Sequence, residues 1–238
     1  MSRFDDVEVT WLGHAAFQLT GPEGTRILID PWLENPNAPD GAADSADADL
    51  IALTHGHFDH VGNTAEIAKR TGAKVVGIFE IAQYIGNQGL EEDQAVGMNI
   101  GGSTEIDGIQ FSMVHAIHSS GIAVNGKTIE GGDPAGFVIR FGNGFTVYHT
   151  GDTELFSDMK FIREFHRPDL MLTCIGDHFT MGPEKAAHSI SLVDPEYVIP
   201  MHYGTFPLLT GTPEALEKNL TQQYRDGLIV AEPGEVIT

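Results

Sequence analysis

The chain has 238 residues, of which 13 are lysine or arginine and 34 are aspartate or glutamate, so its formal net charge at pH 7 is −21. So much negative charge repels nucleic acid phosphates and anionic lipid headgroups, and we therefore expect neither a nucleic acid nor a membrane as partner. The opening stretch MSRFDDVEVTW holds no apolar run of signal-peptide length, and nothing later is long enough to span a bilayer. One cysteine cannot form an internal disulfide. These features predict a cytoplasmic globular protein.

The first half of the chain is expected to form strands and then a strand–helix–strand unit. Alternating apolar residues predict strands, and a Pro-, Ala- and Asp-rich segment over 35–48 predicts a surface loop between them. Asn63 is expected to cap a helix over 64–71, and Gly72 to end it. The predicted strands are 7–12, 16–20, 26–30, 49–53 and 74–79, and a second helix is predicted over about 80–88.

The second half repeats this mixture of elements. Asn143-Gly144 predicts the turn of a hairpin, Pro183 suits the first position of a helix, and Thr212-Pro213 opens the last helix. The predicted strands are 109–118, 135–141, 145–150, 169–175, 196–201 and 228–232, and a further helix is predicted near 158–166. The pattern as a whole favours an α/β fold in which sheets pack on each other with helices outside, in a single domain over 1–238.

Four potential metal ligands follow the predicted strand 49–53 in the stretch THGHFDHVG: His55, His57, Asp59 and His60. Buried ionisable groups cost several kcal/mol each, roughly, unless something pairs with them, and a divalent cation does so. In an extended loop residues 55 and 57 point the same way, and residues 59 and 60 can turn toward a second point. Two ligand pairs can therefore serve two metals.

Further candidates recur in the same local setting, after an apolar strand and before a glycine-containing turn: His118, Asp152 and His202. Catalytic zinc takes several protein ligands and keeps one position for water, so these residues can complete the set. His115 competes with His118, but it lies three residues earlier and is expected to face elsewhere.

Other residues near strand ends carry two interpretations each. His178 either contacts substrate as a catalytic group or is an ordinary loop histidine, and Asp177 beside it either orients a ligand or caps the turn. Asp30 either supports a ligand histidine or caps a turn. His14 is expected to fix a hairpin rather than to bind metal. Cys174 is expected to be a core residue, His149 to lie near the site, and His166 and His188 to lie at the surface.

At this point the chain resembles a known family. HGHFDH has the HxHxDH pattern of the metallo-β-lactamase-fold hydrolases, and its companions are His118, HTGDT at 149–153 and PMHYGTF at 200–206. WLGHAAFQL, ILIDPWL and IGDHFTMGPE are similar to the branch of uncharacterised metal-dependent hydrolases related to sugar-lactone hydrolases. The resemblance implies a four-layer αβ/βα sandwich with a dinuclear site at one edge.

The resemblance also implies roles for seven residues. His55, His57 and His118 would bind one metal, Asp59, His60 and His202 the other, and Asp152 would bridge them. Two divalent ions are implied, zinc foremost, with manganese, iron or nickel as alternatives. A hydroxide bridging the ions would attack a small ester, lactone or phosphodiester, and Asp59 would relay the proton. Assembly into a homo-oligomer is implied in the same way.

Other functions share these motifs. A nuclease of the RNA-processing type would need basic surface, and the sequence has no Lys/Arg cluster. A di-iron oxidoreductase usually carries Glu where His57 stands, together with a flavin domain. Asp152 stands where zinc β-lactamases place a cysteine, which argues against β-lactam hydrolysis. A non-catalytic metal-binding module stays open. Segments 119–134 and 205–212 are expected to wall a pocket for a partly hydrophobic small molecule, and Lys127 is a candidate contact for an anionic one.

Overall fold

Most of the strands fall into two β-sheets. The computed structural model describes residues 3–238. The first sheet is built from β1 (Glu8–Trp11), β2 (Phe17–Thr20), β3 (Arg26–Ile29), β4 (Leu50–Leu53), β5 (Lys74–Ile78), β6 (Ala95–Met98) and β15 (Val236–Ile237). The second is built from β7 (Ser103–Ile106), β8 (Ile109–His115), β11 (Ala135–Arg140), β12 (Thr146–His149), β13 (Leu170–Cys174) and β14 (Tyr197–Met201). Their orders are β15-β1-β2-β3-β4-β5-β6 and β14-β13-β12-β11-β8-β7.

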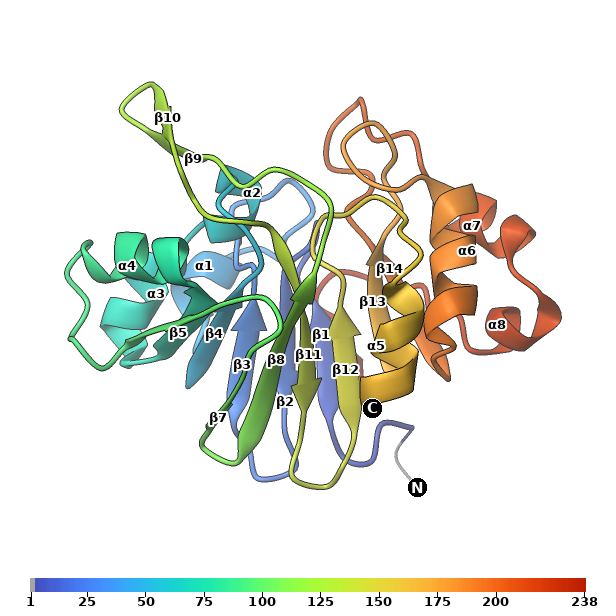
Figure 1. Cartoon of the computed structure of the whole chain (residues 1–238), viewed down its shortest axis with the longest axis horizontal. Coiled ribbons are helices and arrows are strands. Elements are labelled where there is room, and N and C mark those ends of the chain that lie inside the picture. The colour runs from blue at the N-terminus through green and yellow to red at the C-terminus, as the bar shows by residue number, and fades with distance from the viewer. Residues whose placement is uncertain (1–2) are drawn as a thin grey trace.

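Helices flank the two sheets on opposite sides (Figure 1). On the side of the first sheet lie α1 (Ala42–Ser45), α2 (Phe58–Val61), α3 (Thr64–Thr71) and α4 (Phe79–Gly86). On the side of the second sheet lie α5 (Met159–His166), α6 (Pro183–Val193), α7 (Pro213–Asn219) and α8 (Gln222–Asp226). The hairpin of β9 (Ile122–Val124) and β10 (Lys127–Ile129) projects from the body of the protein (Figure 1). The expected αβ/βα sandwich is confirmed.

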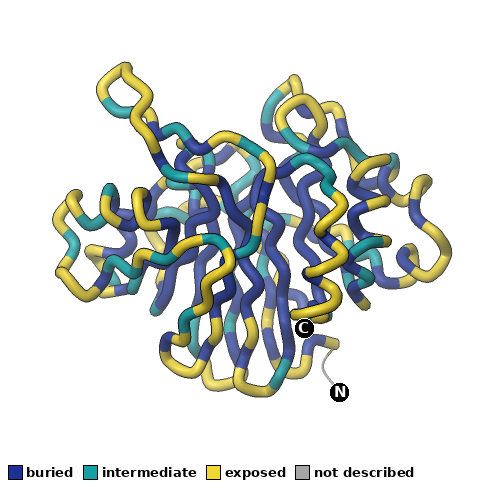
Figure 2. Tube along the Cα trace, in the orientation of Figure 1, coloured by how far each residue is buried: buried dark blue, intermediate teal, exposed yellow. Residues whose placement is uncertain are grey.

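The sequence of the central strands explains why they lie between layers. β4 reads LIAL and β13 reads LMLTC, and every residue of both strands is buried. Such continuous apolar runs suit strands that are covered on both faces, whereas strands with one wet face alternate. Side chains from both sheets, such as Ile51 and Leu172, belong to one hydrophobic cluster. In Figure 2 the central strands are accordingly dark blue, and exposed backbone lies in the outer loops and helices.

Several predicted elements form with the expected boundaries. The helix predicted over 64–71 is α3, and Gly72 ends it with φ 79°, a left-handed conformation that glycine adopts without strain. Asn143-Gly144 joins β11 to β12, which pair antiparallel. Pro183 is the first residue of α6, and the Thr212 side chain accepts a hydrogen bond from the Ala215 amide at the start of α7.

Other expectations are corrected by the structure. The segment 35–48 is not all loop, because α1 forms one helical turn within it. Residues 228–232 do not form a strand, since only Leu228 makes an isolated bridge to Val198. Asn63 occupies the cap position of α3, but its Oδ1 accepts from the Leu33 amide instead of capping the helix. Among the described residues, no helix combines the length and the apolar content needed to cross a bilayer.

Candidate metal centre

The predicted ligands lie where strands of both sheets end. His55 follows β4, His118 follows β8, Asp152 follows β12 and His202 follows β14. β4 runs parallel to β3 and β5, and β12 runs parallel to β13, so their carboxyl ends share an edge with those neighbours. Loops beyond the carboxyl ends of parallel strands are the usual place for a site in an open α/β sheet. The loops that follow β4, β8, β12 and β14 meet at the upper edge of the protein in Figure 1.

The predicted ligands form two groups, and a third group of Asp30, His55 and His60 overlaps both. The ligand atoms of His55, His57 and His118 lie within 4.8 Å of one another. His55 Nε2 is 3.0 Å from His57 Nδ1. A second group within the same limit is formed by His14, Asp59, His60 and His202. The division matches the one that the sequence resemblance implied, except that His14 joins the second group.

Asp152 connects the two groups through a single oxygen. Its Oδ2 lies 3.9 Å from His55 Nε2 and 3.6 Å from His118 Nε2 on one side. On the other side it lies 3.3 Å from His60 Nε2 and 3.0 Å from His202 Nε2. One carboxylate oxygen therefore faces imidazole nitrogens of both groups.

Asp30 fixes the orientation of two of these histidines from behind. Its Oδ2 accepts a hydrogen bond from His60 Nδ1 at 2.7 Å and another from the Thr54 hydroxyl at 2.6 Å. Because the Thr54 proton is used on Asp30, the hydroxyl oxygen accepts from His55 Nδ1, 3.0 Å away. In their neutral forms both rings therefore carry the proton on Nδ1 and turn the Nε2 lone pair inward, as a metal ligand requires. The role of Asp30 as support for a ligand histidine is the one that the structure favours.

His14 occupies a place that its expected hairpin role does not explain. Its Nε2 lies 3.1 Å from Asp59 Oδ2, and its Nδ1 lies 2.8 Å from Thr205 Oγ1. The ring is also 4.0 Å from that of His202, centroid to centroid. Burial, and secondly the charge of nearby His202, lower the pKa of His14 to about 4. A neutral ring beside an ionised Asp59 carries its proton on Nε2 and donates it to that carboxylate.

Three of these buried residues hold an unusual backbone conformation. His14, Asp30 and His202 have φ values of 52°, 46° and 59°. Left-handed φ is uncommon for residues other than glycine and costs about 1–3 kcal/mol, and such residues cluster at functional sites. Asp30 and His202 directly follow β3 and β14, and His14 lies in the turn between β1 and β2, so each strained residue stands where the chain leaves a strand at the site.

The HTGDT turn is held by His149, which does not reach the metal-binding groups. Its Nδ1 accepts the Gly151 amide at 3.1 Å, so Nε2 carries the proton and donates it to the Ala15 carbonyl at 3.0 Å. Gly151 has φ 60°, and a Cβ there would lie 2.5 Å from the Ala135 carbonyl oxygen. Only glycine fits this position, and the tight turn presents Asp152 to the site.

The charges within the site are strongly coupled. Burial opposes ionisation of Asp152, but neighbouring His202 and His60 outweigh it and hold the pKa of this carboxyl well below its usual range. Burial also opposes protonation of His60, but Asp152 and Asp30 outweigh it and raise its pKa. For Asp59, burial is outweighed by the hydrogen bond from His14 and by His60, which lower its pKa to about 2. Burial and the nearby histidines lower the pKa of His55.

The donor set fits divalent cations. Buried polar atoms without a hydrogen-bond partner are concentrated here, and they include His60 Nε2, Asp152 Oδ1 and both ring nitrogens of His202. A buried polar atom left unpaired costs about 1–3 kcal/mol, so a native protein does not gather several at one point without a ligand for them. Imidazole nitrogens and carboxylate oxygens are ligands that zinc, manganese, iron and nickel all accept.

The other histidines and the cysteine singled out in the sequence lie outside these groups. His115 is exposed at the end of β8 and packs against Phe156, with ring centroids 5.2 Å apart. His178 is exposed, and its ring packs against Phe179 at 4.5 Å. His188 is exposed on α6. Cys174 is fully buried, and burial raises the pKa of its thiol to about 11.

A cavity of about 620 Å³ opens over the metal-binding groups. Its floor holds His57, Asp59, His118, Asp152 and His202, and its walls are formed by Phe58, Ser119, Phe179, Phe206, Pro207 and Leu208. The expected wall from segment 205–212 is therefore present, and segment 119–134 contributes Ser119. Lys127, Asp177 and His178 do not line the cavity, and Thr54 and Thr205 were not anticipated because their contacts depend on the fold.

Comparison with known proteins places this geometry in a family. The model of the beta-lactamase superfamily domain matches residues 8–202. The chain belongs to the beta-lactamase superfamily. Within it, the chain is 44% identical to a UPF0173 metal-dependent hydrolase of Herpetosiphon aurantiacus, over 97% of each protein. It is 48% identical to one of Myxococcus xanthus, over 95% of this chain and 81% of the relative.

Solved structures also resemble the chain over nearly its whole length. A novel metallo hydrolase from the hyperthermophilic archaeon Ignicoccus hospitalis is 36% identical and superimposes with a TM-score of 0.86, over 97% of each chain. An isothiocyanate hydrolase from Delia radicum gut bacteria has a TM-score of 0.72 at 19% identity, over 97% of this chain and 98% of that one, and it shares the fold. Like its relatives in the superfamily, the protein is a metal-dependent hydrolase.

Proposed function

We propose that this hydrolase works with two divalent cations, zinc foremost, with manganese, iron or nickel as alternatives. His55, His57 and His118 would hold one cation, Asp59, His60 and His202 the other, and Asp152 would contact both. The position of Asp152 Oδ2, within 3.9 Å of histidine nitrogens from each group, is the observation that carries this proposal.

Divalent cations in this site would supply Lewis acidity and lower the pKa of a water molecule to roughly 7. The chain itself contributes orientation and proton transfer. Asp30 and Thr54 keep the Nε2 lone pairs of His55 and His60 directed inward. Asp59 lies at the floor of the cavity with one oxygen held by His14, and we assign to it the proton of the attacking water.

We propose a small ester, lactone or phosphodiester as substrate, with residues 1–238 acting as one domain in the cytoplasm. The cavity volume of about 620 Å³ suits a small molecule. A nucleic acid substrate is disfavoured by the net charge of −21 and by a cavity lining that, within residues 3–238, includes no lysine or arginine. A homo-oligomer remains part of the proposal on the family resemblance alone.

Metal analysis combined with a small substrate panel tests this function. The purified protein is stripped with chelator, reloaded with zinc or manganese, and analysed for metal per chain. It is then assayed with a phosphodiester, a lactone, a thioester and a β-lactam. We expect two metal ions per chain and metal-dependent turnover of one class other than the β-lactam. Full metal loading with no turnover of any of them would instead support a metal-binding module.

A further inference from the structure

We propose that the substrate of this site is a molecule without an anionic tail that carries an apolar aryl or alkyl group next to the scissile bond. The inference rests on the proposed function and concerns which members of the broad substrate class fit. It is carried by two features of the cavity: an aromatic wall and the absence of an organic cation from the lining that the described residues form.

The aromatic wall is formed by Phe58 and Phe206, and Trp32, which does not line the cavity itself, packs against both rings. Trp32 follows β3, Phe58 begins α2 and Phe206 follows β14. The Trp32 and Phe206 rings stack with centroids 5.6 Å apart, and Phe58 stands edge-on to Trp32, also at 5.6 Å. Edge-on and stacked contacts of this kind hold the rings in place, so the wall is formed before a ligand arrives.

Other apolar side chains complete the rim. Phe58 is 61% exposed, Leu208 52% and Phe179 49%, although all three are large hydrophobic residues. Scattered exposed apolar residues are common, but these three converge on one cavity that also holds the metal-binding groups. A bound molecule that covers them removes apolar surface from water, at a gain of about 25 cal/mol per Å².

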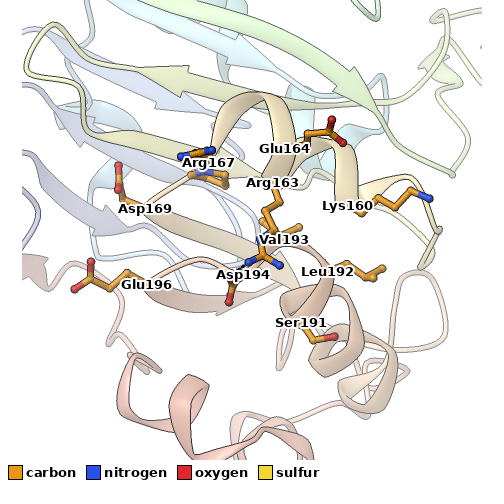
Figure 3. A pocket seen from close by; sticks show the side chains of 11 residues that line it. Lys160, Arg163, Glu164, Arg167, Asp169, Ser191, Leu192, Val193, Asp194 and Glu196 are labelled. Carbon is orange, nitrogen blue, oxygen red and sulfur yellow. Dashed lines mark ion pairs between the residues drawn. The ribbon is translucent and has the colours of Figure 1, made fainter.

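The basic residues are elsewhere. Among the described residues, none of the lysines and arginines lines this cavity. Several gather at a separate hollow of about 840 Å³ between α5 and α6, which shares no residue with it (Figure 3). There Arg163 pairs with Asp194 at 2.7 Å (Figure 3). An anionic tail that extends over the apolar walls, away from the cations proposed for the floor, would therefore meet no lysine or arginine, at a cost in desolvation.

Matched esters separate this inference from the proposed function. The metal-loaded protein is assayed with p-nitrophenyl pentanoate and p-nitrophenyl succinate, which share a leaving group and differ mainly in the carboxylate at the end of the acyl chain. We expect kcat/KM to be at least tenfold higher for the pentanoate. In the series p-nitrophenyl acetate, butanoate and hexanoate, kcat/KM should rise roughly three- to fourfold per methylene as long as the acyl chain contacts the aromatic wall.

A succinate ester that matches or exceeds its neutral counterpart would overturn the inference and leave the hydrolase function intact. If fully loaded protein turns over no ester, ester hydrolysis is refuted as the function. The inference about the apolar wall is then tested by ligand binding. In metal-free protein, 4-nitroacetophenone bound against Phe58 and Phe206 should quench the tryptophan fluorescence with saturation, because Trp32 packs on both rings, and the similarly sized anion 4-nitrobenzoate should not. Equal quenching by both would contradict the proposed selectivity.

Substitution at the rim gives a gain of function as a second readout. Leu208→Lys places a cation at the edge of the cavity on a residue that is already exposed. We expect it to shift the succinate-to-pentanoate preference at least tenfold toward succinate without changing metal content. Phe165→Lys is the matched control, because Phe165 is 72% exposed on α5 and does not line the cavity. An unchanged preference in Leu208→Lys would argue against substrate contact at this wall.

Discussion

The imidazole of His14 joins Thr205 to Asp59, with Nδ1 2.8 Å from Thr205 Oγ1 and Nε2 3.1 Å from Asp59 Oδ2. It thus links the β1–β2 turn to the loop after β14 and to the helical turn of α2. A residue that orients a metal-binding carboxylate in this way typically contributes about 10- to 100-fold to metal affinity.

His14→Ala should therefore weaken binding at the Asp59, His60 and His202 group by about 10- to 100-fold and leave the other group filled. Metal content after dialysis against buffered zinc, measured alongside the unfolding midpoint, provides the readout. His188→Ala, at an exposed histidine on α6, is the control. If both metals are retained at wild-type affinity, His14 has no part in positioning Asp59.

Asp152→Ala should abolish turnover and lower the metal content, because a single oxygen of this residue faces both groups of histidines. We expect turnover to slow by at least about 1,000-fold, since the proposed electrostatic stabilisation disappears with the metal pair. Steady-state kinetics and elemental analysis measure the two effects. The exposed Asp158 supplies the control variant Asp158→Ala. Unchanged kinetics in Asp152→Ala would refute the bridging role.

The metal-free protein should lose stability as the pH falls below about 6.5. The pKa of His14 is about 4 in the folded state, below its ordinary value of 6.5, so the unfolded chain binds more protons between these values. The contribution of His14 to the free energy of unfolding is fully present above pH 6.5 and is lost as the pH falls toward 4. At pH 5 the loss amounts to about 2 kcal/mol. Urea unfolding at pH 7.5 and 5 measures it, and His14→Ala should lose that much less. Parallel losses in both proteins would contradict the assignment.

Cys174 should be inert in the folded protein. Its thiol is fully buried with a pKa of about 11, so about one molecule in a thousand is thiolate at pH 8. Ellman's reagent at pH 8 should modify it at least 100-fold more slowly in native protein than in urea. Rapid native labelling would show that β13 opens to solvent.

The sequence predicts a catalytic role for His178, and that role stays a prediction. Its side chain is exposed and packs on Phe179, which does line the cavity. We therefore expect His178→Ala to slow turnover by less than about threefold, with any effect appearing in KM through Phe179. If turnover at saturating substrate fell by two orders of magnitude or more, a direct catalytic role would be restored.

Much of the fold follows from local sequence. The apolar runs of β4 and β13 predict buried strands, and Gly72 fixes the end of α3 because it reaches a left-handed φ without strain. The errors arise where tertiary contacts decide. Leu228 lies in an apolar run that resembles a strand, yet only an isolated bridge to Val198 forms there. β6, with Gly97 and Met98, has too weak a pattern to be predicted and depends on pairing with β5.

In the candidate site, too, some features follow from local sequence and others depend on tertiary contacts. Ligands in the HGHFDH stretch can be predicted, because their spacing is local and follows a strand. The place of His14 could not, because its partner Thr205 is 191 residues away in the sequence. Thr54 was missed for a different reason: a threonine beside a histidine carries no signal until Asp30 is seen to accept its proton.

The division of the proposed ligands between two sheets bears on how a growing chain acquires them during synthesis. His55, His57 and His118 all leave the ribosome before β12 exists, so one set of three imidazoles is available early. The second set waits for His202, after nearly all of the second sheet has been made. A cation bound early would then help to position the later strands as they dock. If metal is scarce during translation, the protein would reach its folded, metal-loaded state more slowly.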